Sequence, residues 1–316
     1  MSLAAALLIC GVASTVYAHD SALEAAAICM SGCANSIGTG LANLKKIDEA
    51  NIERVKGDAS NRRIRINDRL VLVDAVANSS KPRWTQDRVA AVKSLISKLE
   101  SLYPNFLERA YKNGLKTIEI ASMNEIGATA QVRPSEGNRL TLSEVAFNPP
   151  LGSRWAPDVV KQGRFNDFER ILIHEIAHVV DSRPQPLSVD DFEAQNQFKQ
   201  QSLAYSPGFL SAAAWSYPAG VTRFEYVENT RSSAKNRKEL DELKLSSRLA
   251  REPAEVRIAR EREFSKSHGM PSLYAFVESK PEESFAEFAT FAIIDETAPT
   301  YMSPQMLAWL HKNVLD

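Results

Sequence analysis

The chain contains little cysteine, almost no net charge and a single long apolar run. It has 3 cysteines in 316 residues, and no second pair follows Cys29 and Cys33, so a cysteine-based metal site is not expected. Its 38 basic and 39 acidic residues give a formal net charge of −1, which argues against nucleic acid as the main partner. Outside residues 3–16 no stretch is long and apolar enough to span a bilayer, so stable membrane insertion is not expected.

The apolar run at residues 3–16 carries no charge and is followed by a small-residue pattern that ends at Ala18. This is typical of a secretory signal peptide over residues 1–18, although the usual basic residue near the start is missing. The sequence therefore predicts a secreted or periplasmic protein. In the mature chain Cys29 and Cys33 would remain, either as a disulfide or as two free thiols.

The rest of the chain reads as an N-terminal region, helical or mobile, at residues 19–80, followed by one elaborate α+β domain at residues 81–316. Residues 182–270 are expected to be a long, helical insertion in this domain. Its charge-dense run at residues 231–263 is either a solvated helical pair or a lid or partner-binding arm. Apolar periodicity predicts the main elements of the domain: helix 84–111, strands 116–120 and 139–146, helix 166–181, a helix from 281, and a final helix from 303 to about 315.

The segment His174–His178, with the sequence His-Glu-Ile-Ala-His, is the most informative motif. The chain has only 5 histidines, and two of them lie here, four residues apart. On an α-helix that spacing projects both imidazoles from one face, where they can bind one metal ion. Glu175 lies beside the first histidine and can deprotonate a metal-bound water. The motif therefore predicts a catalytic zinc site.

The flanking residues predict that the motif lies on a buried amphipathic helix. Asn166 or Asp167 can cap its start. Asp181 comes three residues after His178 and returns to the histidine face. There it either accepts a hydrogen bond from a ligand imidazole or is a plain helix-end residue. The apolar stripe of this helix consists of Phe168, Ile171, Leu172, Ile176 and Val179.

Catalytic zinc usually takes three protein ligands and leaves the fourth position to water. A third histidine six residues after His178 is ruled out, because Pro184 occupies that position. A second helix beginning at Pro281 offers Glu283 and Glu287, which are four residues apart and share a face. One of them can bind the metal, with Glu283 first and Glu287 next in line, while the other accepts a hydrogen bond from a ligand histidine. The alternative is that both are solvated surface glutamates.

The two stretches at residues 166–181 and 274–292 together resemble the gluzincin metallopeptidases, closest to the anthrax-lethal-factor-like and Mlc-titration-factor-like branch. The resemblance implies a zincin-like fold, in which a small mixed sheet packs on the first helix and the second helix supplies a glutamate ligand. It implies one zinc ion per chain with Glu283 as the third ligand, and Tyr274 as the hydroxyl that points at the scissile carbonyl. Tyr274 precedes Glu283 by nine residues, and this spacing departs from the family pattern.

These residues predict hydrolysis of peptide bonds by a zinc-activated water. Glu175 would be the general base that takes a proton from the water and passes it to the leaving amine. The oxyanion needs a donor besides the metal, and Tyr274 or His268 can supply it. We therefore expect an exported zinc metallopeptidase that acts on a peptide or protein substrate. The alternatives are a zincin-fold protein that binds metal without turnover and a zinc amidase that acts on cell-wall peptides.

Overall fold

A computed structural model of the chain describes residues 52–54, 62–74, 82–133, 137–148, 165–181, 201–216, 228–229, 234–277 and 280–316. Contacts divide the chain into residues 1–45 and 46–316, and all described residues belong to the second unit. They form a mixed structure of helices and one main sheet, as the predicted α+β class requires. The predicted signal peptide and all three cysteines lie outside the described residues.

The main sheet has six strands in the order β1-β2-β3-β4-β6-β5. Strands β3, β4 and β6 run parallel, whereas β1, β2 and β5 pair antiparallel with their neighbours. The strands predicted at 116–120 and 139–146 are confirmed as β4 and β6, although β6 ends at Ser143 in a 3-10 turn over Glu144–Phe147. The strand bounds are β1 Ile52–Arg54, β2 Arg62–Arg65, β3 Val71–Asp74, β4 Thr117–Ala121, β5 Ala130–Arg133 and β6 Arg139–Ser143.

Strands β1 to β3 correct the prediction of a helical or mobile region over residues 19–80. They are the described part of that region, and β3 pairs in parallel with β4, so this part belongs to the sheet of the domain. Ile64 and Leu72 face each other in the register and are fully buried, whereas Arg63 is exposed. This alternation with a period of two is that of a strand. The pattern is confined to strands of 3 or 4 residues, which are too short for the alternation to be recognised in the sequence.

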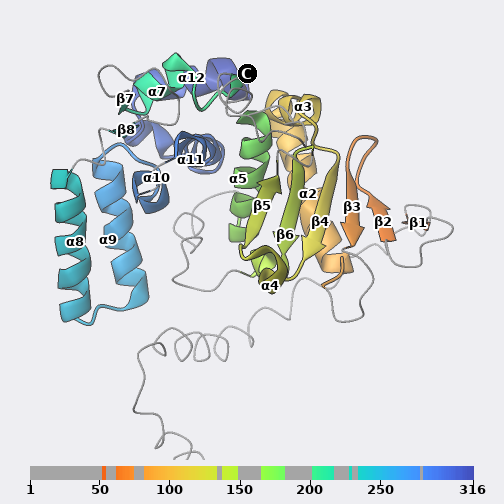
Figure 1. The fold of residues 1–316 in the computed structure, drawn as a ribbon, viewed down its shortest axis with the longest axis horizontal. Coiled ribbons are helices and arrows are strands. Elements are labelled where there is room, and N and C mark those ends of the chain that lie inside the picture. The colour runs from red at the N-terminus through yellow and green to blue at the C-terminus, as the bar shows by residue number, and fades with distance from the viewer. Residues whose placement is uncertain are drawn as a thin grey trace, which may run out of the picture. The chain divides into compact units, whose positions relative to one another are not determined.

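The helix predicted over residues 84–111 is confirmed as two helices, α2 (Gln86–Leu102) and α3 (Pro104–Lys112). The chain breaks at Tyr103 because Pro104 has no N–H for the preceding helix, while it suits the first turn of the next one. Figure 1 shows α2 behind the strands of the sheet. The buried side of α2 shares one core with the strands and consists of Val89, Val92, Leu95, Ile96 and Leu99.

The two helices predicted to hold the site are confirmed as α5 (Asp167–Asp181) and α11 (Pro281–Ile294). Helix α5 contacts β5, α3 and α11, so it lies between the sheet and α11 (Figure 1). All five residues of the predicted apolar stripe of α5 are buried, as are nearly all of its other side chains. A helix buried on most of its surface is surrounded by the domain, and its few polar side chains therefore need partners inside the protein.

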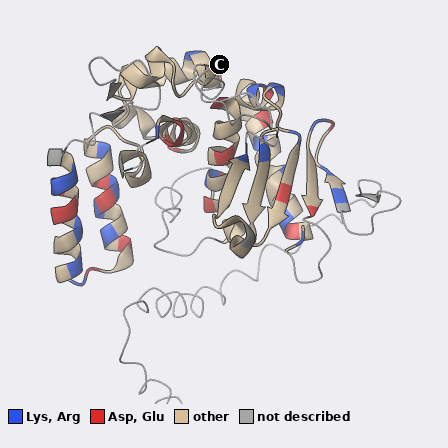
Figure 2. Ribbon diagram, viewed as in Figure 1, with Lys and Arg blue, Asp and Glu red and all other residues tan. Residues whose placement is uncertain are grey.

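The described part of the insertion at residues 182–270 is mostly helical, as predicted. Helices α8 and α9 pack as a pair that carries charges of both signs (Figure 2). The final helix is confirmed, with Ser303 Oγ accepting a hydrogen bond from the backbone N of Met306. No helix among the described residues is long and apolar enough to cross a membrane. The remaining elements are α4 (Met123–Ile126), α7 (Pro207–Ala212), β7 (Trp215–Ser216) paired with β8 (Glu228–Asn229), α8 (Ala234–Leu249), α9 (Ala254–Ser267), α10 (Leu273–Val277), a 3-10 turn (Ala298–Thr300), α12 (Pro304–Leu310) and a π-helical turn (His311–Leu315).

Candidate metal centre

Helix α5 is fixed at both ends by polar side chains. Asn166 Oδ1 accepts a hydrogen bond from the backbone N of Glu169 at 2.9 Å, and Glu169 Oε2 accepts one from the backbone N of Asn166 at 2.7 Å. This is a reciprocal capping box, and Lys98 Nζ on α2 lies 2.7 Å from the other Glu169 oxygen. At the far end, Asn113 Nδ2 donates to the backbone oxygens of residues 179–180, both at 3.0 Å. These contacts stabilise the two ends of the helix.

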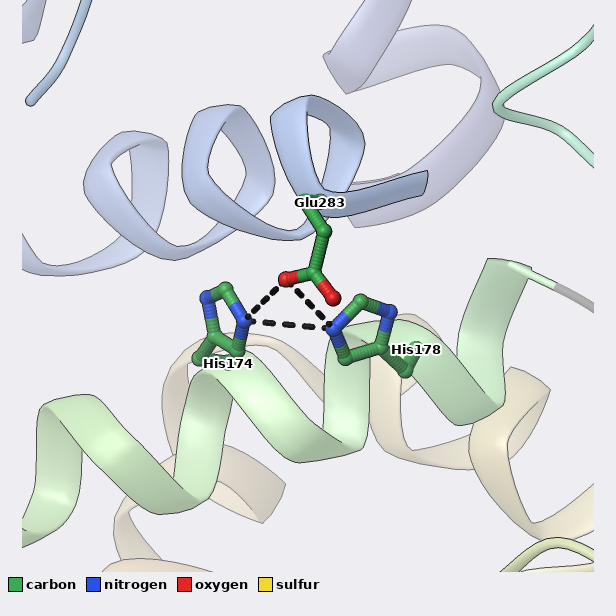
Figure 3. A group of neighbouring side chains, drawn as sticks. All are labelled: His174, His178 and Glu283. Atoms are coloured by element: carbon green, nitrogen blue, oxygen red, sulfur yellow. Dashed lines mark hydrogen bonds and ion pairs between the residues drawn. The ribbon is translucent and has the colours of Figure 1, made fainter. Parts of the chain in front are cut away.

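Three side chains from α5 and α11 converge on one point (Figure 3). His174 Nε2 and His178 Nε2 are 3.2 Å apart, and each lies 3.4 Å from Glu283 Oε2. The three ligand atoms form a nearly equilateral triangle. The structure thus brings together the two predicted histidines and the predicted third ligand as a group that could hold a metal ion.

The three side chains of the cluster differ in their exposure to solvent. The side chain of His174 is 1 % exposed, whereas those of His178 and Glu283 are 16 % and 23 % exposed. Solvent therefore reaches the triangle past His178 and Glu283. A catalytic metal needs an open coordination position, and this is the side on which one can exist.

The charges of the cluster depend strongly on one another. Burial disfavours a charged His174, but its contacts with Glu283 and Glu287 outweigh burial and raise the pKa of His174 to about 10. The pKa of His178 is also raised, because Glu283 outweighs its burial. Burial of Glu283 is in turn outweighed by the two imidazoles, which hold the pKa of its carboxyl well below the usual range. Protons on the imidazoles therefore balance the carboxylates, and a metal ion has to displace them in order to bind.

Glu287 lies at the back of the cluster, as the prediction of a carboxylate behind a ligand histidine requires. Its Oε1 is 2.9 Å from His174 Nδ1, a close polar contact whose angle departs from that of a standard hydrogen bond. Its Oε2 accepts a hydrogen bond from Ser272 Oγ and lies 3.5 Å from Arg170 Nη2. Burial raises the pKa of Glu287, but Arg170 and then His174 outweigh it, and the pKa falls to about 2. Glu287 is therefore an ionised carboxylate in the interior.

Tyr274, on α10, points into the site. Its hydroxyl donates a hydrogen bond to Glu283 Oε2 at 2.9 Å, the same oxygen that faces both imidazoles. Its ring centroid is 6.1 Å from that of His174. A hydroxyl at this place can either hold the carboxylate ligand or reach a substrate bound beside it.

Glu175 is buried, with 4 % of its surface exposed. Its negative charge raises the pKa of both His174 and His178, so its carboxylate lies within electrostatic reach of the cluster. A buried carboxylate near a metal site is suited to accept a proton.

Asp181 does not have the predicted role of holding a ligand imidazole. Its carboxylate accepts hydrogen bonds from Ser202 Oγ at 2.8 and 2.9 Å and from the backbone N of Ala204 at 2.6 Å. Its oxygens are instead occupied by Ser202 and Ala204. Tyr205 in the same segment donates to Glu282 at 2.8 Å, so this segment joins the end of α5 to the start of α11.

His268, considered as an alternative oxyanion donor, lies between α9 and α10. Its Nδ1 is 2.8 Å from the backbone oxygen of Phe264, and its ring packs against those of Phe264 and Phe276. Its Nε2 is 3.8 Å from Glu239. These contacts direct the ring towards the α8–α9 pair. His268 is therefore not placed to donate a hydrogen bond to a substrate oxyanion.

Two residues of the centre, Arg170 and Ser272, were not indicated by the sequence analysis. Arg170 carried a signal that could have identified it. It is a charged residue four positions before His174, on a helix whose other side chains are mostly apolar, so burial would demand an acidic partner. Ser272 carried no such signal, because a serine before a short helix is ordinary.

Comparison with known proteins finds no matching family model, no similar curated protein and no similar solved structure. The resemblance to gluzincins therefore rests on the residues at 166–181 and 274–292 alone. The structure adds that these two stretches, which are about a hundred residues apart in the chain, place three potential metal ligands within 4.8 Å of one another.

Proposed function

We propose that this chain is an exported zinc metallopeptidase with a zincin-like catalytic domain, in which His174, His178 and Glu283 bind the metal. The observation that carries this proposal is the size of the triangle of ligand atoms. Atoms about 2.0–2.1 Å from a tetrahedral zinc ion lie about 3.3–3.4 Å from one another. The three edges here are 3.2, 3.4 and 3.4 Å. A zinc ion therefore fits with little movement of the side chains.

The donor atoms favour zinc over other common ions. Two imidazole nitrogens and one carboxylate oxygen are a frequent set at catalytic zinc, whereas calcium and magnesium prefer oxygen ligands. Three protein ligands leave a fourth position, which would lie on the exposed side of His178 and Glu283. When bound, zinc supplies an electrophile that lowers the pKa of a nearby water to about 7 and polarises a carbonyl.

Two residues of the chain would move or donate protons. The carboxylate of Glu175 accepts a proton from the attacking water and returns it to the nitrogen of the leaving amine. The hydroxyl of Tyr274 exchanges Glu283 Oε2 for the carbonyl oxygen of the substrate as negative charge develops there. A hydrogen bond that forms only with the developing charge stabilises the transition state more than the bound substrate.

The edge of the sheet next to α5 supports a peptide substrate. Strand β5 (Ala130–Arg133) pairs with β6 on one side, is the outermost strand of the order at that end among the described residues, and contacts α5. An extended peptide can add to such an edge through main-chain hydrogen bonds. The scissile bond would then run beside the helix that carries the histidines.

The buried Glu175 favours hydrolysis over metal binding without turnover, because its carboxylate lies within electrostatic reach of both histidines and is suited to act as a general base. Export is proposed from residues 1–18 alone.

The substitution Glu175→Gln tests the proposal, because it keeps the size of the side chain and removes the base. We expect the variant to retain zinc and to lose about 10²–10⁴-fold in kcat. Hydrolysis is measured by mass spectrometry on unfolded proteins, on a peptide library and on cell-wall peptides. Glu263→Gln, an exposed position on α9, is the matched control. Unchanged hydrolysis in Glu175→Gln would refute the mechanism.

A further inference from the structure

A continuous chain of buried polar side chains leads from Arg170 to the metal ligand His174. Arg170 Nη2 lies 3.5 Å from Glu287 Oε2, to which Ser272 Oγ also donates a hydrogen bond. The other oxygen, Glu287 Oε1, lies 2.9 Å from His174 Nδ1. Arg170 and His174 are 1 % exposed and Glu287 is 0 % exposed, so water cannot substitute for any of these contacts.

The spacing of these residues on α5 and α11 brings each carboxylate opposite a side chain of α5. Arg170 and His174 are one turn apart on α5, and Glu283 and Glu287 are one turn apart on α11. Glu283 faces His174 on the metal side, and Glu287 lies between His174 and Arg170. The guanidinium of Arg170 is held in turn over the ring of Phe291, one further turn along α11, at 4.9 Å from the ring centroid.

We propose that Arg170 and Ser272 are positioning residues for the metal. They fix Glu287 so that it holds the Nδ1 proton of His174 and leaves Nε2 free to bind the ion. An imidazole binds a metal through the nitrogen that carries no proton, and the partner of the other nitrogen decides which one that is. Ser272 Oγ donates to Oε2 and the guanidinium of Arg170 lies beside the same oxygen, so the carboxylate of Glu287 is held with Oε1 facing His174. This inference rests on the proposed function, because it concerns the same metal.

A purely structural role for the network predicts different results. Removing one partner of a buried ion pair destabilises a protein, because the other charge is left uncompensated in the interior. In that case Arg170→Met would change the stability of the metal-free protein but leave the zinc affinity of the folded protein as it was. A positioning role predicts that zinc affinity falls, whatever happens to the stability of the metal-free protein.

The experiment compares the wild type with Arg170→Met, Arg170→Lys and Ser272→Ala in the full mature chain. Zinc dissociation constants are measured by competition with a chromogenic chelator, and the visible absorption of the Co²⁺-substituted proteins reports the ligand geometry. We expect Arg170→Met to bind zinc about 10–100-fold more weakly, as is usual when a partner of a ligand histidine is lost. Ser272→Ala should show a smaller loss, and Arg170→Lys should recover part of the affinity. The Co²⁺ spectrum should change in Arg170→Met.

Two matched controls distinguish a loss of the Arg170–Glu287–His174 network from the general effect of removing a buried polar side chain. Lys98→Met breaks another ion pair of α5, the one with Glu169, and Ser265→Ala removes another buried hydroxyl. Both should bind zinc as the wild type does. Wild-type zinc affinity and Co²⁺ spectrum in Arg170→Met and Ser272→Ala would overturn the inference while the proposed function stands. A wild type that binds no zinc would overturn both. If Arg170→Met does not fold, Arg170→Lys and Ser272→Ala decide.

Discussion

Replacing Asp181 by asparagine is expected to stabilise the protein at neutral pH. The carboxylate of Asp181 is buried against Ser202 and the backbone N of Ala204. Burial raises its pKa to about 6, although these two hydrogen bonds lower it. The amide of asparagine keeps an acceptor oxygen for Ala204, and the serine hydroxyl can turn to accept from the amide nitrogen. The substitution therefore removes the charge and little else.

The magnitude follows from the difference between the folded and unfolded pKa of Asp181. The ordinary value is 3.8 and the folded value is about 6, a difference of about 2 units, which corresponds to about 3 kcal/mol. Between these two values the folded state binds the proton more tightly than the unfolded state does. The contribution of Asp181 to stability is thus most favourable below pH 4, falls as the pH rises to about 6, and stays low above that. Asp181→Asn should remove this fall.

The assay is urea-induced unfolding of the metal-free wild type and variant at pH 4, 5, 6 and 8. The variant should be up to about 3 kcal/mol more stable at pH 8, with the difference shrinking towards pH 4. Asp295→Asn is the control of opposite sign. Burial raises the pKa of Asp295, but Thr297 and Lys266 outweigh burial and lower it. The ionised carboxylate therefore stabilises the protein above the ordinary pKa of 3.8, and this contribution is lost as the pH falls below that value. That variant should be less stable than the wild type at pH 8.

A loss of stability in Asp181→Asn at pH 8, or a difference that does not depend on pH, would refute the reasoning. It would mean that the charge of Asp181 is needed in the folded protein. A direct contact with a ligand imidazole, which the sequence predicted and the structure does not show, would have that effect.

Two further predictions concern Tyr274 and the aromatic packing around Gly208. Tyr274→Phe removes the hydroxyl that donates to Glu283, and the zinc-loaded variant should keep its metal but lose about 10²–10³-fold in kcat with little change in KM. Equal kcat in steady-state assays would limit Tyr274 to holding Glu283. Gly208→Ala would place a Cβ 2.6 Å from Trp309 Nε1, so it should destabilise the protein by about 1–3 kcal/mol. An unchanged thermal midpoint would show that the tryptophan moves aside freely.

The two helices of the candidate site were predictable because each carries local signals over its whole length. Helix α5 begins at a capping residue, and its apolar stripe has the helical period. The sequence therefore predicted that His174 and His178 lie on the same face of the helix. Helix α11 begins at Pro281, and its spacing placed Glu283 and Glu287 on one face. The contact between the two helices did not follow from either pattern alone. It was inferred from the chemistry of a metal that needs a third ligand.

The parts that sequence reasoning missed depend on contacts between distant segments. Of the two roles left open for Asp181, the hydrogen bond to a ligand imidazole is not the one observed, because residues 202–204 occupy its oxygens and nothing in that segment predicts this contact. Arg170 and Ser272 acquire their roles only once α11 packs against α5 and α10 packs against α11. The strands at residues 52–74 join the sheet through β3 alone, which pairs with β4 more than forty residues further along the chain. Such short strands have little preference of their own.

The metal content of the mature protein tests the central claim most directly. The wild type is reconstituted with zinc, freed of loosely bound metal and measured by elemental analysis beside His174→Ala. His268→Ala, a histidine outside the cluster, is the matched control. We predict about one zinc ion per chain in the wild type and in His268→Ala, and none in His174→Ala. A wild type without tightly bound zinc, or equal zinc in wild type and His174→Ala, would contradict the assignment of the metal centre.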